Sequence, residues 1–432
     1  MVRAFSWEPW ESSMSSSPRR VRGLVALAAL VLGASMLSAC DNGDDIKGGG
    51  SADDTTGAHA DSGNDPSGDS SASEDATPAG SISTNLKRRT DVPVSTQLLV
   101  IAHHGRLSQV SVSGSGDVGA LDGTIAGDGI KWKAGDLLEP GTTYTVNASV
   151  HGDDGELVTK KQQFTTEALS LDQQTYPSVA PLPGETVGVG MPVVVSFDVP
   201  VTDRANIEKH LHVTSSPQQP GTWHWVSDNE VHYRPKTYWK AGTQVDVDVD
   251  INGVDAGHGI YGQEDRDVKF QIGDAHIYKV DTKTDQMKVY SNGKLLRTIP
   301  ITTGQQPKYT TRSGIKVIIE KFARKDMNSE TVGITGADAY NIKGVQWAMR
   351  VTYSGEFVHA APWSVGSQGY ANVSHGCTGM STANADWLYH MSLRGDVVDY
   401  TGTDRPMEPG NGYGDWNIPW QEYKQGSALA AS

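Results

Sequence analysis

The feature that most constrains the fold is a pattern of alternating apolar residues that recurs at an offset of 101 residues. Each copy combines a short strand pattern, a Gly-Thr turn and a longer strand in which every second residue is apolar. A period of two bounded by turn residues is typical of antiparallel strands with one buried face. Duplication of a unit of this length predicts two tandem immunoglobulin-like β-sandwiches. The paired positions are Ile130 and Val231, Trp132 and Tyr233, Gly141 and Gly242, Tyr144 and Val245, Val146 and Val247, Ala148 and Val249, and Val150 and Ile251.

The repeat sets the expected extent of both sandwiches. We predict the first at residues 91–170 and the second at residues 171–273. A chain with 48 Gly and 20 Pro in 432 residues agrees with turn-rich β structure rather than with a helical protein. Trp223 and Trp225 lie in the second copy, and we interpret them as ordinary surface or core residues. A carbohydrate-stacking role is the weaker alternative, because buried aromatic residues are usual in sandwiches.

The pattern changes after residue 273, which predicts a third, β-rich domain at residues 274–402. Alternating segments joined by a Ser-Asn-Gly-Lys turn indicate a β-meander at its start. Ser381 is placed to cap a helix at residues 382–394, so the domain is expected to hold one or two short helices. Residues 403–432 form a tail, and its Trp416 and Trp420 are expected to dock onto one of the neighbouring domains.

The N-terminal residues resemble an export signal. Three arginines precede a short uncharged apolar run at residues 23–36, which is too short for an ordinary membrane-spanning helix. The run ends in Leu-Ser-Ala-Cys, which resembles a bacterial lipobox with Cys40 as the lipidated residue. We therefore expect residues 1–40 to be a signal peptide, and the protein to be exported and anchored through lipid on Cys40 to the outer face of the cytoplasmic membrane. A plain cleaved signal is the alternative.

Residues 41–90 are expected to form a disordered tether between this anchor and the sandwiches. They are rich in Gly, Ser and Asp and hold almost no large apolar residue, so they cannot bury enough surface to offset the entropy of ordering. The whole chain has a net charge of −15 and no Lys/Arg-rich stripe. This charge argues against nucleic acid as a partner.

Cys377 is one of only two cysteines, and it follows His375 and Gly376. A thiol becomes a useful nucleophile when a base takes its proton, and His359 is a second candidate base. Spacing alone leaves three interpretations, namely a nucleophile, a buried structural thiol, or a zinc ligand together with the histidines. If Cys40 carries lipid, Cys377 has no intramolecular disulfide partner, which favours a reactive thiol.

This region resembles the catalytic domain of the L,D-transpeptidases, whose motif is a His followed, after a spacer, by Ser/Thr-His-Gly-Cys. Here the motif is His359 followed by Ser374-His375-Gly376-Cys377. The order of lipobox, tether, immunoglobulin-like domains and catalytic domain resembles the multidomain branch of that family. The likeness extends to Thr-Tyr-Ser-Gly at residues 352–355, His-Ala-Ala-Pro-Trp-Ser at 359–364, Arg-Gly-Asp at 394–396 and Gly-Asp-Trp-Asn-Ile-Pro-Trp at 414–420.

The resemblance implies acyl transfer between stem peptides of peptidoglycan, with neither a metal nor an organic cofactor. Cys377 would form a thioester with a stem tetrapeptide and release D-Ala, and an amine of a neighbouring stem would complete a 3→3 cross-link. His359 is matched to the general base, and the backbone N–H groups of His375, Gly376 and Cys377 to the oxyanion hole. A mobile flap is implied at about residues 319–347. The substrate-binding residues expected around it are Tyr353, Met327, Ser374, Trp363 and Gly379.

Three positions depart from the family pattern. Ala360 stands where a Ser is frequent, but a backbone carbonyl can orient the imidazole without that hydroxyl. Gly379 replaces a frequent Asn, which leaves the donor preference open. A Thr-Arg-Ser-Gly segment at residues 311–314 stands where Thr-Pro-x-Gly is usual.

Other functions remain as alternatives. One is a non-catalytic peptidoglycan-binding lipoprotein, and another is carboxypeptidase or exchange activity on the same thioester. A papain-like peptidase is weaker, because that class places its Cys before its His. A zinc site is disfavoured because no fourth ligand is evident. We expect a monomer.

Overall fold

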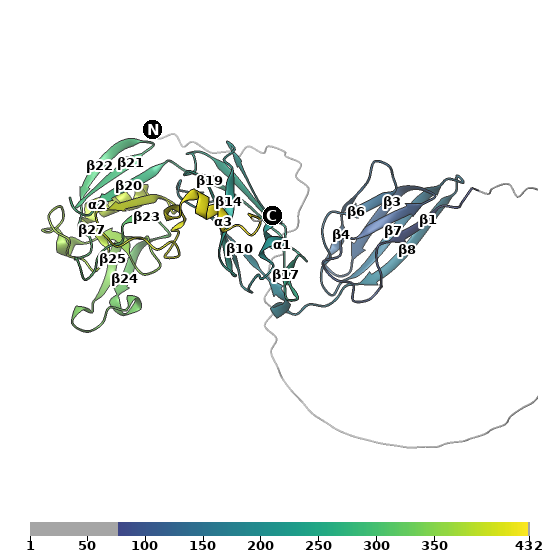
Figure 1. Ribbon diagram of the computed structural model, residues 1–432, viewed down its shortest axis with the longest axis horizontal. Coiled ribbons are helices and arrows are strands. Elements are labelled where there is room, and N and C mark those ends of the chain that lie inside the picture. The colour runs from purple at the N-terminus through teal and green to yellow at the C-terminus, as the bar shows by residue number, and fades with distance from the viewer. Residues whose placement is uncertain (1–76, 431–432) are drawn as a thin grey trace, which may run out of the picture. The chain divides into compact units, whose positions relative to one another are not determined.

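The computed structural model describes residues 77–430. The predicted signal peptide, Cys40 and residues 41–76 of the predicted tether lie outside the described residues. Within this part of the chain 28 strands and three α-helices are found, which confirms the mainly β prediction (Figure 1). None of the described helices is both long and apolar enough to cross a membrane.

The first sandwich consists of two four-stranded sheets around a core that includes Trp132 and Tyr144. One sheet has the order β1 (Ser81–Thr84), β2 (Leu99–His103), β6 (Lys131–Ala134) and β5 (Gly123–Ile125). The other has the order β4 (Gly119–Leu121), β3 (Gly105–Gly114), β7 (Thr143–Gly152) and β8 (Leu157–Thr165).

Strand β1 lies inside the segment predicted to be disordered. It pairs in antiparallel fashion with β2, and its Ile82 is buried in the core. The first sandwich therefore begins before residue 91, and the prediction of disorder is wrong for this strand. One buried apolar residue is enough to order this Ser/Thr-rich segment, because β2 supplies hydrogen-bond partners for its backbone.

The second sandwich repeats this plan. One sheet has the order β10 (Pro177–Ala180), β12 (Val193–Phe197), β15 (Glu230–Pro235) and β14 (Gly221–Ser227). The other has the order β11 (Thr186–Val187), β19 (Arg266–Ile272), β16 (Gln244–Val249) and β13 (Leu211–Ser216). A small sheet of β9 (Gln174–Thr175), β18 (Ile260–Gly262) and β17 (Asp255–Gly257) and the helix α1 (Arg204–Glu208) complete the module.

The offset of 101 residues corresponds to equivalent strands in the two modules. β6 lies between β2 and β5, as β15 lies between β12 and β14, and β7 and β16 occupy the same place in the opposite sheets. Trp132 and its counterpart Tyr233 are both buried. Trp223 and Trp225 are each 6% exposed and belong to the core, which disfavours the carbohydrate-stacking alternative.

The C-terminal domain is built on two sheets. The first begins with the predicted meander, whose turn is formed by Asn292 and Gly293 with φ of 48° and 79°, values that suit a tight hairpin. Its order is β22 (Lys294–Pro300), β21 (Gln286–Ser291), β20 (His276–Asp281), β28 (Val397–Thr401) and β23 (Gly314–Val317).

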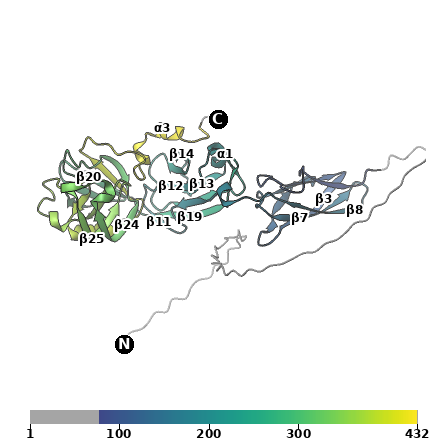
Figure 2. The same cartoon turned by 90° about the horizontal axis from the view of Figure 1, so that it is seen from below.

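The second sheet carries the motif residues. Its order is β24 (Glu320–Asn328), β25 (Asn341–Arg350), β26 (Phe357–Ala360) and β27 (Thr378–Met380). β24 and β25 form a long hairpin over the segment predicted as a flap, and Figure 2 shows the two strands side by side. Helix α2 (Thr382–Met391) packs on this sheet, and the Ser381 side chain caps it by accepting a hydrogen bond from the Asn384 N–H.

The tail contacts both the C-terminal domain and the second sandwich. The Asn417 side chain bonds the backbone of Ile315 in β23, and the Trp416 indole donates to the Gly190 carbonyl at 2.8 Å. The tail ends in α3 (Trp420–Gln425), whose Tyr423 is fully buried. The expected docking is therefore observed on both domains.

Candidate active site

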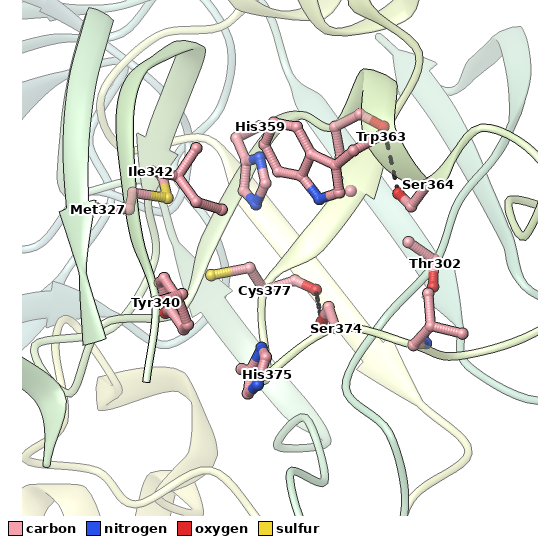
Figure 3. A pocket seen from close by; sticks show the side chains of 13 residues that line it. Thr302, Met327, Tyr340, Ile342, His359, Trp363, Ser364, Ser374, His375 and Cys377 are labelled. Atoms are coloured by element: carbon pink, nitrogen blue, oxygen red, sulfur yellow. Dashed lines mark hydrogen bonds between the residues drawn. The ribbon is translucent and has the colours of Figure 1, made fainter. Parts of the chain in front are cut away.

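A cavity of about 220 Å³ opens beside Cys377 (Figure 3). It lies between the β24–β25 hairpin, the β26–β27 pair and the loop that joins β26 to β27. Its lining residues are Thr302, Met327, Tyr340, Ile342, His359, Ala361, Trp363, Ser364, Val373, Ser374, His375, Cys377 and Gly379.

The parallel pairing of β26 with β27 brings the motif together. His359 lies opposite Gly379 in this register. Because side chains alternate along a strand, Cys377, two residues before Gly379, projects from the same face as His359. The His359 ring and the Cys377 side chain therefore line the same cavity (Figure 3).

His359 lies near the C-terminal end of β26 and is 5% exposed. Its Nδ1–H donates to the backbone carbonyl of Ala360 at 2.8 Å, so a neutral ring presents an unprotonated Nε2 on its other side. Burial lowers the pKa of His359, against a smaller opposing effect of this hydrogen bond. The ring is therefore neutral at neutral pH and available as a base.

Cys377 is 9% exposed, and its thiol points to the Gly355 carbonyl with Sγ and O 3.6 Å apart. Burial, together with a smaller effect of the Glu356 carboxylate, raises the pKa of the Cys377 thiol to about 12. The Phe357 N–H and the Lys316 ammonium oppose that rise. The thiol is thus protonated at neutral pH, and it requires a base at the moment of attack.

The loop before Cys377 is fixed by its own hydrogen bonds. The Ser374 hydroxyl donates to the Cys377 carbonyl at 2.6 Å and accepts from the Gly376 N–H at 3.1 Å. Gly376 has φ of +126°, a conformation that disfavours any side chain. The Gly376 N–H, predicted as an oxyanion donor, is therefore already engaged. The backbone N–H groups of His375 and Cys377 make no hydrogen bond within residues 77–430.

His375 lies at the opposite end of the cavity mouth from His359. Its ring packs between Tyr309 and Tyr340, with centroid distances of 4.6 Å and 4.9 Å. Close by, Lys308 of the Tyr309 loop forms an ion pair with Asp338 of the hairpin at 2.5 Å. His375 thus joins the hairpin to the body of the domain through tilted ring contacts.

The predicted substrate-binding residues divide into two groups. Met327, Ser374, Trp363 and Gly379 line the cavity. Tyr353 does not, because it is 50% exposed and lies in the turn beside Glu230 and Asp415. It lies next to the tail, where the Ser354 N–H donates to Asn411, and its role in binding the donor stays a prediction.

Several lining residues were not predicted. Tyr340 and Ile342 reach the cavity because the hairpin folds back over it, a tertiary effect that leaves no local signal. Thr302 exchanges backbone hydrogen bonds of 2.9 Å and 2.8 Å with Gly379.

The packing around Gly379 explains why no larger side chain stands there. A Cβ on Gly379 would lie 2.8 Å from the Cβ of Ala361 and 3.2 Å from the Thr302 methyl group. Any side chain at this position would have to displace one of these neighbours. Gly379 and Ala361 therefore form a wall of the cavity from which no large side chain projects.

No metal-binding cluster accompanies these residues. In the part of the chain that the structure describes, no group of three or more His, Cys, Asp or Glu side chains is placed to hold a metal ion. The chemistry that the arrangement supports is attack by a buried thiol on an acyl carbon with a neutral imidazole as base.

Comparison with known families separates the chain into two parts. Residues 89–255 match the bacterial Ig domain family, and residues 275–399 match the L,D-transpeptidase catalytic domain family. The first match covers parts of both sandwiches, and the second covers both sheets of the C-terminal domain.

The chain is also similar to individual proteins. It is 38% identical over 344 residues to L,D-transpeptidase 2 of Mycobacterium tuberculosis (strain CDC 1551 / Oshkosh), covering 79% of this chain and 82% of that protein. It is 35% identical over 250 residues to L,D-transpeptidase 1 of M. tuberculosis (strain ATCC 25618 / H37Rv), covering 55% of this chain and 93% of that protein. A solved L,D-transpeptidase in complex with imipenem matches with 38% identity and a TM-score of 0.46, covering 52% of this chain and 97% of that one.

Proposed function

This chain belongs to the L,D-transpeptidase family, and we propose that it forms 3→3 cross-links in peptidoglycan through a thioester on Cys377. The observation that carries the proposal is the placement of Cys377 and His359 on one face of the β26–β27 pair, inside a cavity. The donor would be a stem tetrapeptide, and the acceptor an amine on the third residue of a neighbouring stem.

In the first step Cys377 is acylated. His359 Nε2 takes the thiol proton while Sγ attacks the carbonyl carbon between the third residue and the terminal D-Ala. Collapse of the tetrahedral intermediate breaks the C–N bond, and the His359 imidazolium returns the proton to the leaving amine. D-Ala departs, and the acyl group remains on sulfur as a thioester.

The oxyanion formed in this step needs donors near the sulfur. The backbone N–H groups of His375 and Cys377 fit this role, because the Ser374 and Thr311 hydroxyls hold the loop without using them. Thr311 Oγ1 donates to the Gly376 carbonyl at 2.8 Å, which fixes the loop on its other side. Preorganised donors of this kind typically contribute a large part of the stabilisation of the transition state.

In the second step the acceptor amine attacks the thioester. His359, neutral again, takes a proton from the amine, the new amide bond forms, and the C–S bond breaks to release the Cys377 thiol. If water replaced the amine, the same thioester would give carboxypeptidase activity, and D-amino acids would give exchange. The neutral state of His359 in its buried site suits the base role in both steps.

The test is the intact mass of the protein after incubation with a tetrapeptide donor and, separately, with a carbapenem. We expect one acyl adduct per chain with either compound, release of D-Ala from the tetrapeptide, and loss of both signals in Cys377→Ala. Full D-Ala release by Cys377→Ala would exclude the thioester. An unmodified wild-type protein would instead favour a non-catalytic wall-binding lipoprotein.

The role of His359 is tested with a matched histidine. His359→Gln is expected to slow acylation by about 10²–10⁴-fold, the usual contribution of a general base. His390→Gln serves as the control, because His390 is an exposed residue of α2 that does not line the cavity. Equal rates for the two variants would refute the assignment of His359.

The site of action is also a proposal. Lipid on Cys40 would hold the exported chain at the outer face of the cytoplasmic membrane, next to its peptidoglycan substrate. Cys40→Ser should move the protein from the membrane fraction to the soluble fraction. The proposal of a monomer is tested by light scattering of the purified protein.

A further inference from the structure

Three charged side chains are buried behind Cys377, and the mechanism above does not use them. Arg312, Lys316 and Glu356 are 9%, 0% and 5% exposed. The Glu356 carboxylate joins them, since Oε1 accepts from Arg312 Nη1 at 3.0 Å and Oε2 forms an ion pair with Lys316 Nζ. Charges are rarely buried so deeply, and such clusters are frequently no more stabilising than apolar residues of the same size.

Glu356 belongs to the turn that contacts the sulfur. The residue before it, Gly355, supplies the carbonyl that faces the Cys377 thiol, and the residue after it, Phe357, supplies an N–H directed at the same sulfur. Glu356 Cγ also lies 3.9 Å from where a Cβ would stand on Gly376. The Glu356 side chain thus packs beneath the nucleophile loop while its backbone neighbours contact the sulfur.

The two cations connect the carboxylate to the remaining segments around Cys377. Arg312 donates its backbone N–H to Glu356 Oε1 at 3.2 Å, and it directly follows Thr311, whose hydroxyl holds the Gly376 carbonyl. The Lys316 ammonium lies 3.7 Å from the ring centroid of Tyr400, whose hydroxyl bonds Thr378 at 2.7 Å. Thr378 is the residue after Cys377, so the cluster supports the nucleophile from both sides.

We propose, as an extension of the proposed function, that Arg312, Lys316 and Glu356 form a positioning cluster for Cys377. The carboxylate fixes the turn that contacts the sulfur, and the Lys316 ammonium stabilises the negative charge that the sulfur gains during attack. The titratable groups that face the sulfur are His359 from β26, Tyr340 from the hairpin, Tyr400 from β28, His375 from the loop, and Glu356 and Lys316 from below.

A purely structural cluster and a positioning cluster make different predictions. If the cluster only stabilises the fold, removal of either charge loosens the site, and thiol reactivity changes in the same direction in both variants. If the charges act on the sulfur, the two removals have opposite effects, because one carries negative and the other positive charge.

The test is the rate of Cys377 alkylation by iodoacetamide between pH 7.5 and 9.5, in a Cys40→Ser background in which Cys377 is the only thiol. Glu356→Gln is expected to raise the rate and Lys316→Met to lower it, each by about tenfold, which corresponds to one pKa unit. Acylation by the tetrapeptide donor should fall at least about tenfold in both variants, because the turn and the charge are both needed there.

Three further variants keep the experiment interpretable. Lys316→Arg retains the charge and should alkylate within about threefold of wild type, allowing for its different shape. The double variant Glu356→Gln/Lys316→Met removes both charges, and its alkylation rate should return toward wild type while acylation stays low. Lys321→Met is the matched control, since Lys321 is a half-buried lysine over Tyr389 that does not line the cavity.

Alkylation rates that fall together in the two single variants, or rates unchanged by both, would overturn the proposal. Failure of the proposed function gives a different result. In that case the wild-type protein would not be acylated by the tetrapeptide, whereas the order of alkylation rates among the variants would still hold.

Discussion

The two sandwiches share one plan but present different side chains on the same strand. The outward face of β6 carries Lys131 and Lys133, both exposed, at the positions where β15 carries His232 and Arg234. His232 and Arg234 are only 3% and 2% exposed, because the tail covers them. The repeated pattern therefore determines the sandwich itself, while the residues on its outer face determine whether another segment packs there.

The covered face of β15 is held by specific contacts. Arg234 lies over three aromatic rings of the tail, at 4.6 Å from Trp416, 5.2 Å from Trp420 and 4.1 Å from Tyr423. His232 Nδ1 lies 2.9 Å from an Asp415 carboxylate oxygen, and both side chains are buried. Removing one partner of a cation–π contact or of a buried ion pair lowers the free energy of unfolding more than removing an exposed charge does. Substitutions can therefore measure the difference between the two modules.

The largest effect is expected from removing the tail after Thr403. The free energy of unfolding of the second sandwich and C-terminal domain should fall by more than about 5 kcal/mol, since loss of one large buried aromatic side chain costs about 3–5 kcal/mol and the tail supplies the buried Tyr413 and Tyr423. Calorimetry should detect this as a lower melting temperature. The transition of the first sandwich should not move, and thiol alkylation should change less than stability. An unchanged melting temperature would contradict the docking role of the tail.

A smaller effect is expected from a matched pair of substitutions on the equivalent strands. Arg234→Ala should lower the free energy of unfolding by about 3–5 kcal/mol, because it exposes the tail aromatics and leaves the Ile418 carbonyl without its donor. Lys133→Ala should cost less than about 0.5 kcal/mol, as is usual for an exposed residue. Denaturant unfolding of both variants makes the comparison, and equal losses would disprove it.

The next prediction concerns how stability changes with pH, which depends on the protonation of His232. The Asp415 and Glu230 carboxylates together outweigh burial and raise the pKa of His232 to about 10. A raised pKa in the folded state contributes stability below the unfolded value of about 6.5, and this contribution is lost as pH rises toward 10. Stability should therefore fall by about 2–3 kcal/mol between pH 7 and 9.5, at about 1.4 kcal/mol per pKa unit.

The control for this prediction is His232→Gln, which cannot titrate. Its stability is lower at pH 7, and its pH dependence should be flatter over the same range. If the variant and the wild-type protein lost stability in parallel, other groups would account for the pH dependence.

The smallest effect is one that the two modules should share. Gly141 and Gly242 occupy the same turn with φ of 60° and 78°. Substitution by Ala should cost about 1–2 kcal/mol at each position, because a Cβ disfavours this conformation. Thermal unfolding of Gly141→Ala and Gly242→Ala should give similar losses. A clear difference would mean that the equivalence of the modules does not extend to their turns.

Much of the fold could be predicted because its signals are local. The alternation of Tyr144, Val146, Ala148 and Val150 indicated β7, and Ser381 indicated the start of α2. Strand β1 was missed because only Ile82 marks it as buried. Strand β24 was hidden by its charged residues, which project from a hairpin rather than from a two-sided sheet.

The residues of the site also divide into those with a local sequence signal and those without one. Cys377 and His359 were found because they belong to a short motif that resembles one family, and the parallel pairing of β26 with β27 brings the two ends of that motif together. Arg312, Lys316 and Glu356 were not singled out, because charged residues are ordinarily exposed, and their pairing spans 40 residues or more of sequence. Tyr353 was expected near the cavity but does not line it, because its local motif does not specify which side of the turn its side chain takes.

The position of the tail also has a consequence for the order of folding during synthesis. Arg234 and His232 are covered by residues made about two hundred positions later, near the end of the chain. The first sandwich can complete its packing as soon as its own strands are available. The second cannot bury its outer cations until Tyr423 has been added, so its final structure forms only after translation is almost finished.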